Sequence, residues 1–316
     1  MEKTNIITEI LEAFKLFDGN YKREQVDAAV ELKEEITPFL IEILDNVLAD
    51  PDAFLENEDR YDHIYSLMLL GHFRESKAHD VIIDLFSLPD EIPHELFGDL
   101  TTSDLPTILI RTCGGSIQRI RSMASNKKAD DYCRISALNA MAYAVVGGIA
   151  SREEVISFFG TLFTGKETDE DSDFWSLLAN FVCDLYPQEL MDTIEKAYDD
   201  NLIASGMIQY EHFNKALEDG QERCLERLKT DLEGRSLDNI HDSMSWWACF
   251  DEEPQFYSAQ DPDDLINYTH LNTSGLSSQK SKEKKNKAKK KKTKTGQSFE
   301  AEKPALIPNG VPNLLR

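Results

Sequence analysis

The sequence predicts an all-α protein, a HEAT/armadillo-like α-solenoid of about six helix pairs followed by a disordered basic tail. Apolar residues recur at helical spacing through residues 1–250, and strictly alternating patterns are nearly absent. The first helices of successive pairs begin mostly at the roughly 40–47-residue interval of HEAT and armadillo units. One pair cannot bury both of its faces, whereas stacked pairs can. A compact helical bundle has the same periodicity and is the alternative.

The apolar pattern and its punctuation place the helices along the chain. The predicted pairs are 23–34 with 38–49, 61–72 with 76–88, 104–113 with 115–125, 131–147 with 152–164, 173–185 with 188–200, and 209–219 with 221–233. A leading helix covers 4–17, and a final helix covers 237–248. Ser151 has the form of an N-cap with Glu154 three residues later. Pro38 is expected at a first helical position, where a proline is well tolerated.

Charge divides the 316 residues into three parts. Residues 1–250 carry 22 basic and 49 acidic residues, whereas residues 280–316 carry twelve basic and three acidic residues. This asymmetry predicts a HEAT-like helical domain at 1–250, an acidic C-terminal extension at 251–270 and a disordered lysine-rich tail at 271–316. A phosphate backbone would be repelled by residues 1–250, which argues against nucleic-acid binding by the helical domain.

Composition also indicates the cellular location of the protein. The apolar runs fall short of the ~18 residues that a membrane-spanning helix needs, and the N-terminus lacks the form of a signal peptide. Five cysteines lie far apart without a CxxC pair, which argues against a disulfide framework or a structural zinc site. A cytoplasmic location fits this pattern best. We expect no cofactor and no bound metal.

Four segments carry a resemblance to a known family: HIYSLMLLGHFRESKAHDVIIDLFSLP, ELFGDLTTSDLPTIL, RISALNAMAYAVVGGIASREEVISFFGTLF and MSWWACF. In combination they resemble a bacterial family known as domain of unknown function 1186, over roughly residues 20–250. The resemblance implies a HEAT-like helical protein without an assigned activity and without catalytic residues to transfer. Members of that family often end in a SEC-C motif, a short cysteine-rich zinc segment. This chain departs from them there, because no cysteine follows Cys249.

The MSWWACF segment places three aromatic residues, Trp246, Trp247 and Phe250, at the end of the helical domain. Tryptophan is enriched in the hot spots of protein interfaces, so these residues are candidates for binding a protein partner. The alternative is a terminal helix whose aromatic side chains cap the last repeat, as every solenoid requires at its ends.

The run KSKEKKNKAKKKKTK at 280–294 is the strongest local signal in the sequence. Such a run repels itself, stays extended and can hold phosphates by charge alone. The candidate residues for binding a polyanion are Lys284, Lys285, Lys287, Lys289, Lys290, Lys291 and Lys292. Neutralisation by the acidic body and a role as a targeting or solubility element are the alternatives.

Four of the seven histidines fall within residues 63–94: His63, His72, His79 and His94. If they stand on adjacent antiparallel helices, His72 and His79 could approach each other across the connecting turn and hold a divalent metal together with a carboxylate. No HExxH spacing supports such a site, and histidines that end or cap helices are the simpler interpretation. Neither a GxSxG motif nor a glycine-rich phosphate loop is present, so no catalytic residue is assigned.

The sequence therefore favours a protein-binding helical-repeat scaffold or adaptor without a catalytic step, whose protein partner is unknown. The first alternative is a binder of RNA, other nucleic acid or anionic lipid that acts through the lysine-rich tail. Its affinity would fall steeply with salt, because counterions are released on binding. The second alternative is an enzyme or lyase that uses a groove of the helical body; whether the protein is an enzyme is left open, and a non-enzymatic role is favoured.

Overall fold

The structure is a computed structural model that describes residues 2–57 and 59–250, all within one unit of the chain. These residues form α-helices and short 3-10 helices and contain no β-strand, so the all-α prediction is confirmed for them. The α-helices are α1 (Glu2–Lys15), α2 (Arg23–Glu31), α3 (Lys33–Ala49), α4 (Pro51–Leu55), α5 (Asp62–Phe73), α6 (His79–Leu85), α7 (Ile92–Phe97), α8 (Leu100–Ser103), α9 (Leu105–Thr112), α10 (Gln118–Ser125), α11 (Asp131–Val146), α12 (Arg152–Gly160), α13 (Phe174–Asp184), α14 (Met191–Asp199), α15 (Tyr210–Asp219), α16 (Gln221–Gly234) and α17 (Ile240–Met244). The 3-10 helices are η1 (Ser76–Ala78), η2 (Gln188–Leu190) and η3 (Ala248–Phe250). None of the helices in this part of the chain is long and apolar enough to cross a bilayer.

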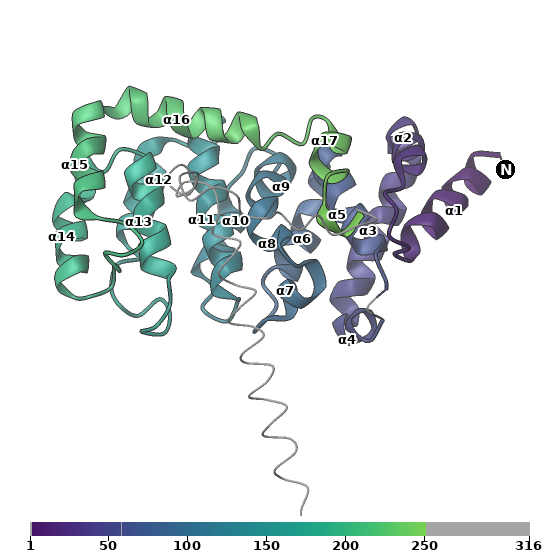
Figure 1. The fold of residues 1–316 in the computed structure, drawn as a ribbon, viewed down its shortest axis with the longest axis horizontal. Helices are drawn as coiled ribbons and strands as arrows, with labels where there is room; N and C mark the ends of the chain where they lie inside the picture. Colours follow the sequence, from purple (N-terminus) through teal and green to yellow (C-terminus); the bar gives the residue numbers. More distant parts are fainter. Residues whose placement is uncertain (1, 58, 251–316) are drawn as a thin grey trace, which may run out of the picture. The chain divides into compact units, whose positions relative to one another are not determined.

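The predicted helix pairs are present, with shifts at their ends. They are α2 with α3, α5 with α6, α9 with α10, α11 with α12, α13 with α14, and α15 with α16. The helices α5, α9, α11 and α13 form a row in which each contacts the next, and α3 extends the row on the other side of α5 (Figure 1). The second helix α6 contacts α10, so neighbouring pairs also touch there. This succession of stacked pairs is consistent with an α-solenoid.

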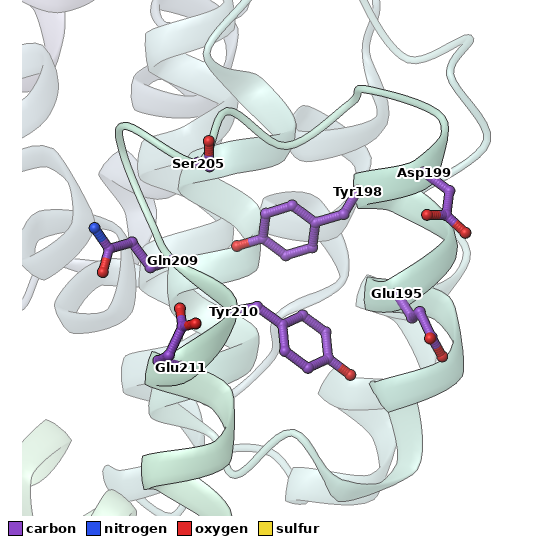
Figure 2. Close-up of a pocket in the computed structure, with 7 residues that line it drawn as sticks. All are labelled: Glu195, Tyr198, Asp199, Ser205, Gln209, Tyr210 and Glu211. Atoms are coloured by element: carbon purple, nitrogen blue, oxygen red, sulfur yellow. The ribbon is translucent and has the colours of Figure 1, made fainter.

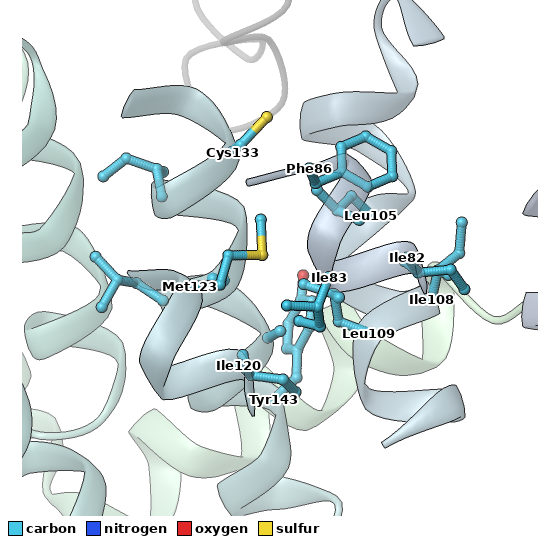
Figure 3. Packing of buried hydrophobic residues seen from close by; sticks show 14 of the residues in the cluster. Ile82, Ile83, Phe86, Leu105, Ile108, Leu109, Ile120, Met123, Cys133 and Tyr143 are labelled. Atoms are coloured by element: carbon cyan, nitrogen blue, oxygen red, sulfur yellow. The ribbon is translucent and has the colours of Figure 1, made fainter. Parts of the chain in front are cut away.

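One continuous apolar core runs through the stack, from Ile7 on α1 to Met244 on α17. The helices α5 and α11 are buried around nearly their whole circumference, because neighbouring helices cover them on several sides. An all-round apolar helix is the pattern expected for such a position. Figure 3 shows the part of this core between α6 and α11, which includes Ile82, Ile83, Phe86, Leu105, Ile108, Leu109, Ile120, Met123, Cys133 and Tyr143.

Side-chain caps define the ends of the central helices. The Asp130 carboxylate accepts hydrogen bonds from the backbone N–H groups of Tyr132 and Cys133 at 2.9 and 3.1 Å, and thereby starts α11. Ser151 Oγ accepts from the N–H of Glu154 at 3.1 Å, which confirms Ser151 as the N-cap of α12. These bonds satisfy donors that would otherwise lack partners at a helix start.

The last pair departs from the arrangement of the others. In addition to its partner α15, α16 contacts α11 and α13, which are the first helices of earlier pairs. Figure 1 shows α16 crossing above α13 and α11 in the direction of α17. The chain is thereby returned to α5, which contacts α17. The predicted final helix at 237–248 is divided into α17 and η3, and its interpretation as a cap of the last repeat is wrong.

Pro38 lies inside α3 and does not begin it, since that helix starts at Lys33. Its missing N–H removes the hydrogen bond to the Glu34 carbonyl only, close to the helix start. The acidic residues Glu34 and Glu35 in the first turn favour this earlier start through the helix dipole. Three short helices, α4, α7 and α8, were also not expected from the sequence, because helices of four to six residues carry too few apolar positions to show a period.

Gly71 of α5 is a point at which the returning chain packs closely against the helical row. A Cβ at this position would lie 2.9 Å from Ile108 Cγ1 and 3.1 Å from Leu237 Cδ1, whereas one at Gly234 of α16 would meet nothing within 4 Å. We expect Gly71→Ala to lower the free energy of unfolding by about 1–3 kcal/mol, because the core must shift to admit the methyl group. Gly234→Ala serves as the matched control and should stabilise by up to about 1 kcal/mol. Urea unfolding of both variants measures the difference; equal effects at the two positions would contradict the close packing at Gly71.

Candidate functional site

Residues 235–250, here called the closing segment, return the chain to the N-terminal helices. Leu237 is buried beside Gly71, and its carbonyl accepts a hydrogen bond from His72 Nδ1 at 2.7 Å. Met244 is fully buried in the common core. These contacts join two parts of the chain that are far apart in sequence. The apolar residues of the closing segment therefore belong to the same core as α5.

Ionic contacts hold the start of the closing segment. Asp238 Oδ1 accepts from Arg111 at 2.8 Å and from Arg74 at 3.1 Å. Hydrogen bonds to the side chains of Arg111, Ser236 and Arg74 hold the pKa of Asp238 below its usual range. Arg111 also donates to the carbonyls of Gly71 and His72, so that one guanidinium spans α5 and the closing segment.

His241 connects α17 to the first helix pair. Its Nε2 lies 2.8 Å from Asp27 Oδ1, and its Nδ1 lies 2.8 Å from the Tyr21 hydroxyl. Because the carboxylate can only accept, Nε2–H donates to Asp27, and in the neutral imidazole Nδ1 then accepts from the Tyr21 hydroxyl. Burial raises the pKa of Tyr21, so its hydroxyl keeps the proton that this bond requires.

The three aromatic residues singled out in the sequence fall into two groups. Phe250 packs against Phe17 and Tyr61, with ring centroids at 6.0 and 6.2 Å, and Trp247 stacks on Phe250 at 5.9 Å. Trp247 and Phe250 are half-buried against the common core. Trp246, in contrast, is 72% exposed. The structure thus brings Trp247 and Phe250 into an N-terminal aromatic cluster and leaves Trp246 at the surface.

A polar cluster lies between α16 and the first helices that it crosses. The Tyr143 hydroxyl on α11 donates to Asp231 of α16, and Arg235 Nε donates to the same carboxylate at 3.2 Å. Asp184 at the end of α13 is also near Asp231. The residue is exposed at the surface, but nearby protein atoms partly desolvate its carboxyl group, and this desolvation together with the charge of Asp231 raises the pKa of Asp184 to about 6. Like charges near one another disfavour ionisation. This cluster couples α16 to the helical row electrostatically.

An open cleft of about 670 Å³ lies between the C-terminal end of α14 and the start of α15 (Figure 2). It is lined by Glu195, Tyr198, Asp199, Ser205, Gln209, Tyr210 and Glu211. The rings of Tyr198 and Tyr210 meet edge to face at 5.7 Å. This cleft was not predicted from the sequence, although Glu195, Tyr198 and Asp199 have the i, i+3, i+4 spacing that puts them on one helix face.

The four histidines of residues 63–94 have separate partners. His63 Nε2 bonds to the Leu96 carbonyl at 2.8 Å, and His79 Nδ1 bonds to Thr112 Oγ1 at 2.9 Å. His94 Nδ1 lies 3.4 Å from Thr101 Oγ1, and His72 bonds to the closing segment as described above. Burial lowers the pKa of His79, which favours its neutral form. Within residues 2–57 and 59–250, no three His, Cys, Asp or Glu side chains converge in a way that could hold a metal ion.

The seven candidate polyanion-binding lysines lie outside the described residues, as do the predicted acidic extension at 251–270 and the predicted tail at 271–316. The five cysteines are all within the described part of the chain and are free thiols. Burial raises the pKa of Cys133 and Cys183, so neither thiol is activated as a nucleophile.

The stacked helix pairs define the class of protein: an all-helical protein with an architecture consistent with an α-solenoid. The chain belongs to the family described as protein of unknown function (DUF1186), whose sequence profile matches residues 5–251. The resemblance noted in the sequence is confirmed by this match. The matched region ends one residue beyond the closing segment, so the returning chain is part of the family's domain.

Two relatives from chlamydiae are similar over nearly their whole length. An uncharacterized protein of Chlamydia trachomatis serovar D is 31% identical over 237 residues, which cover 74% of this chain and 94% of that protein. An uncharacterized protein of Chlamydia muridarum is 30% identical over 244 residues, which cover 76% of this chain and 96% of that protein. No solved structure matches this chain.

Asp238 provides a test of how the closing segment is held. We expect Asp238→Asn to destabilise the segment by about 1 kcal/mol, a modest cost because the carboxylate is 68% exposed and screened by solvent. Amide hydrogen exchange should then accelerate in residues 237–250 before it does in α11. Glu233→Gln, which removes an exposed pair with Lys229 at 4.0 Å, is the matched control and should leave exchange unchanged. Identical exchange in both variants would show that apolar contacts alone hold the segment.

Asp184 makes stability depend on pH in a defined direction. Since its pKa rises from 3.8 to about 6 on folding, the folded state keeps the proton that the unfolded state has lost in this range. The contribution of Asp184 to stability therefore decreases as pH rises from about 4 to about 6. We expect Asp184→Asn to stabilise the protein above pH 6 by at most about 1 kcal/mol after solvent screening, and the gain to vanish below about pH 4.

Thermal unfolding of Asp184→Asn between these pH values tests the expectation. Asp171→Asn removes one carboxylate from an exposed loop position and controls for net charge. An equal gain from both variants at every pH would assign the effect to net charge and would contradict a specific interaction of Asp184 with Asp231.

Proposed function

We propose that the protein is a protein-binding helical scaffold that acts without a chemical step in its helical domain. The observation that carries this proposal is the exposure of Trp246, a large apolar side chain on a segment that is otherwise anchored. Its neighbours Met244 and Trp247 both contribute to the common core. An exposed tryptophan on a fixed support is a preformed contact, which lowers the entropic cost of binding a partner.

The path of α16 and of the closing segment after it determines which surface is free for a partner. Because α16 crosses α13 and α11, the ends of the first helices on that side are occupied by the chain itself. The partner surface that we propose is therefore the exposed part of the closing segment around Trp246, next to the N-terminal aromatic cluster. Trp247 and Phe250 support this surface from below and do not contact the partner with their full side chains.

The lysine-rich run supports a second candidate function, the binding of RNA, other nucleic acid or anionic lipid. Ten lysines within residues 280–294 provide the charge for it, and this attraction would not depend on the helical domain. The two functions differ in salt dependence. Binding through Trp246 is dominated by apolar contact, whereas binding through lysines weakens by orders of magnitude between about 50 and 200 mM salt.

The proposal also includes a cytoplasmic location. All five cysteines are free, and several of them are buried in the core, which is the usual pattern of proteins in a reducing compartment. Fusion of the full chain to a fluorescent protein in its native host tests this part of the proposal, and a signal confined to the envelope would contradict it.

Substitution of the tryptophans tests the protein-binding function. Full-length protein captures its partner from native cytoplasm, and the affinity of the purified complex is then measured by titration calorimetry at about 50 and 200 mM salt. We expect Trp246→Ala to weaken binding by roughly 30-fold, equivalent to about 2 kcal/mol, with unchanged thermal stability. Phe39→Ala removes a different exposed aromatic residue, on α3, and should bind like the original chain.

Three outcomes separate the candidates. A complex of fixed stoichiometry that Trp246→Ala weakens at both salt concentrations supports the protein-binding scaffold. A complex that Trp246→Ala and Phe39→Ala leave equally strong contradicts it. Capture that disappears at the higher salt in all variants favours the polyanion-binding function in its place.

A further inference from the structure

The cleft between α14 and α15 combines aromatic faces with negative charge. Glu195 and Asp199 stand on α14, and Glu211 stands on the first turn of α15. Figure 2 shows the Tyr198 and Tyr210 rings between these two sets of carboxylates. None of the described lysines or arginines lines the cleft. Its walls therefore offer three carboxylates and two half-buried tyrosine rings to whatever enters it.

The two rings are fixed by contacts on their far sides. The Tyr198 hydroxyl donates to the Ile208 carbonyl at 2.7 Å, which ties the ring to the loop between the two helices. Tyr210 packs on the fully buried Phe213 at 6.2 Å. The arrangement of the rings thus exists before any ligand binds. Preorganisation of this kind lowers the entropic cost of binding.

The carboxylates of the cleft are available for a ligand. Glu195, Asp199 and Glu211 make no ion pair with any described residue, unlike the neighbouring Asp200, which pairs with Lys196 at 3.9 Å. The negative field of the cleft also reaches the tyrosines: the pKa of Tyr198 is raised to about 12, first by burial and then by Glu211. An anionic ligand would be repelled from this cleft.

The spacing of these groups distinguishes between kinds of cation. The carboxylates of the cleft do not converge closely enough to form a site for a metal ion. An organic cation does not require converging ligands, because its charge is spread over a larger group and is attracted by the faces of aromatic rings. A lysine ammonium or an arginine guanidinium on its flexible stem fits a cleft with tyrosine walls and a carboxylate rim.

We propose that the α14–α15 cleft binds a lysine or arginine side chain carried by an extended segment of the partner protein. This inference rests on the proposed protein-binding function and adds the chemistry of a second contact on the partner. The two contacts are complementary: Trp246 provides apolar area, and the cleft selects a cationic side chain. A partner that carries both features gains affinity from two linked contacts.

A peptide titration on the full-length protein tests the cleft directly. The probes are two fluorescein-labelled glycine–serine peptides with a single central lysine or a single central arginine, and a third peptide with a central glutamine is the control. Fluorescence anisotropy is measured at about 150 mM salt, where long-range attraction by the acidic surface is screened. We expect the cationic peptides to bind and the glutamine peptide to bind at least tenfold more weakly.

Variants of the lining residues assign the binding to the cleft. The double substitution Asp199→Asn and Glu211→Gln keeps the size of both side chains and should weaken the cationic peptides about five- to tenfold. Tyr210→Ala should weaken them similarly, whereas Tyr210→Phe keeps the ring face and should restore binding. Glu153→Gln changes an exposed carboxylate on α12 and is the matched control. Equal loss in Glu153→Gln, or no loss in the lining variants, overturns the proposal.

The source of the cation is tested in the same titration. A full-length variant with Gln at Lys284, Lys285, Lys287, Lys289, Lys290, Lys291 and Lys292 removes seven of the ten lysines within residues 280–294. Unchanged peptide affinity in this variant supports a partner as the source. A markedly higher affinity would identify the chain's own lysines as the occupant and overturn the assignment to a partner. Trp246→Ala should leave peptide binding intact, so failure of the cleft and failure of the Trp246 surface are distinguishable.

Discussion

The burial of α5 and α11 on all sides is the constraint on which the rest of the structure depends. A helix that is apolar around its whole circumference must be covered by several neighbours. Single helix pairs cannot provide this cover, and stacking of successive pairs supplies most of it. The closing segment covers the surface of α5 that stacking leaves exposed. Its residues Leu237 and Met244 belong to the same core. Because the closing segment must reach α5, α16 runs back along the stack towards it.

The two candidate binding surfaces lie near the end of the helical stack and near the end of the closing segment. Trp246 is exposed at the end of the closing segment, and the α14–α15 cleft lies in the last pairs before α16 turns back. Both surfaces are held by side chains that face the core: Trp247 and Phe250 in one case, Phe213 in the other. Rigid support and exposed contact groups are thus found together, as a binding role requires.

The sequence was sufficient to predict the helix pairs but not the short helices between them or the path of the last pair. Apolar spacing and the Ser151 cap located the pairs because both depend on neighbouring residues along the chain. The return of α16 depends on which distant surface its apolar face meets, and its sequence resembles that of any amphipathic surface helix. The histidines illustrate the same limit: His72 bonds to Leu237, 165 residues further along the chain. The Tyr198–Tyr210 pairing likewise arises from a loop geometry that no local pattern encodes.

The closing segment has a consequence for the order of events during synthesis. Tyr21 and its partner His241 are separated by 220 residues. At a synthesis rate of roughly 5–20 residues per second, the first helices leave the ribosome some 10–45 s before their cover is made. Throughout this interval Phe17, Tyr21 and Tyr61 face water or other proteins of the cell. The helices around Tyr21 therefore emerge well before the segment that covers them, and a nascent chain needs protection at this surface.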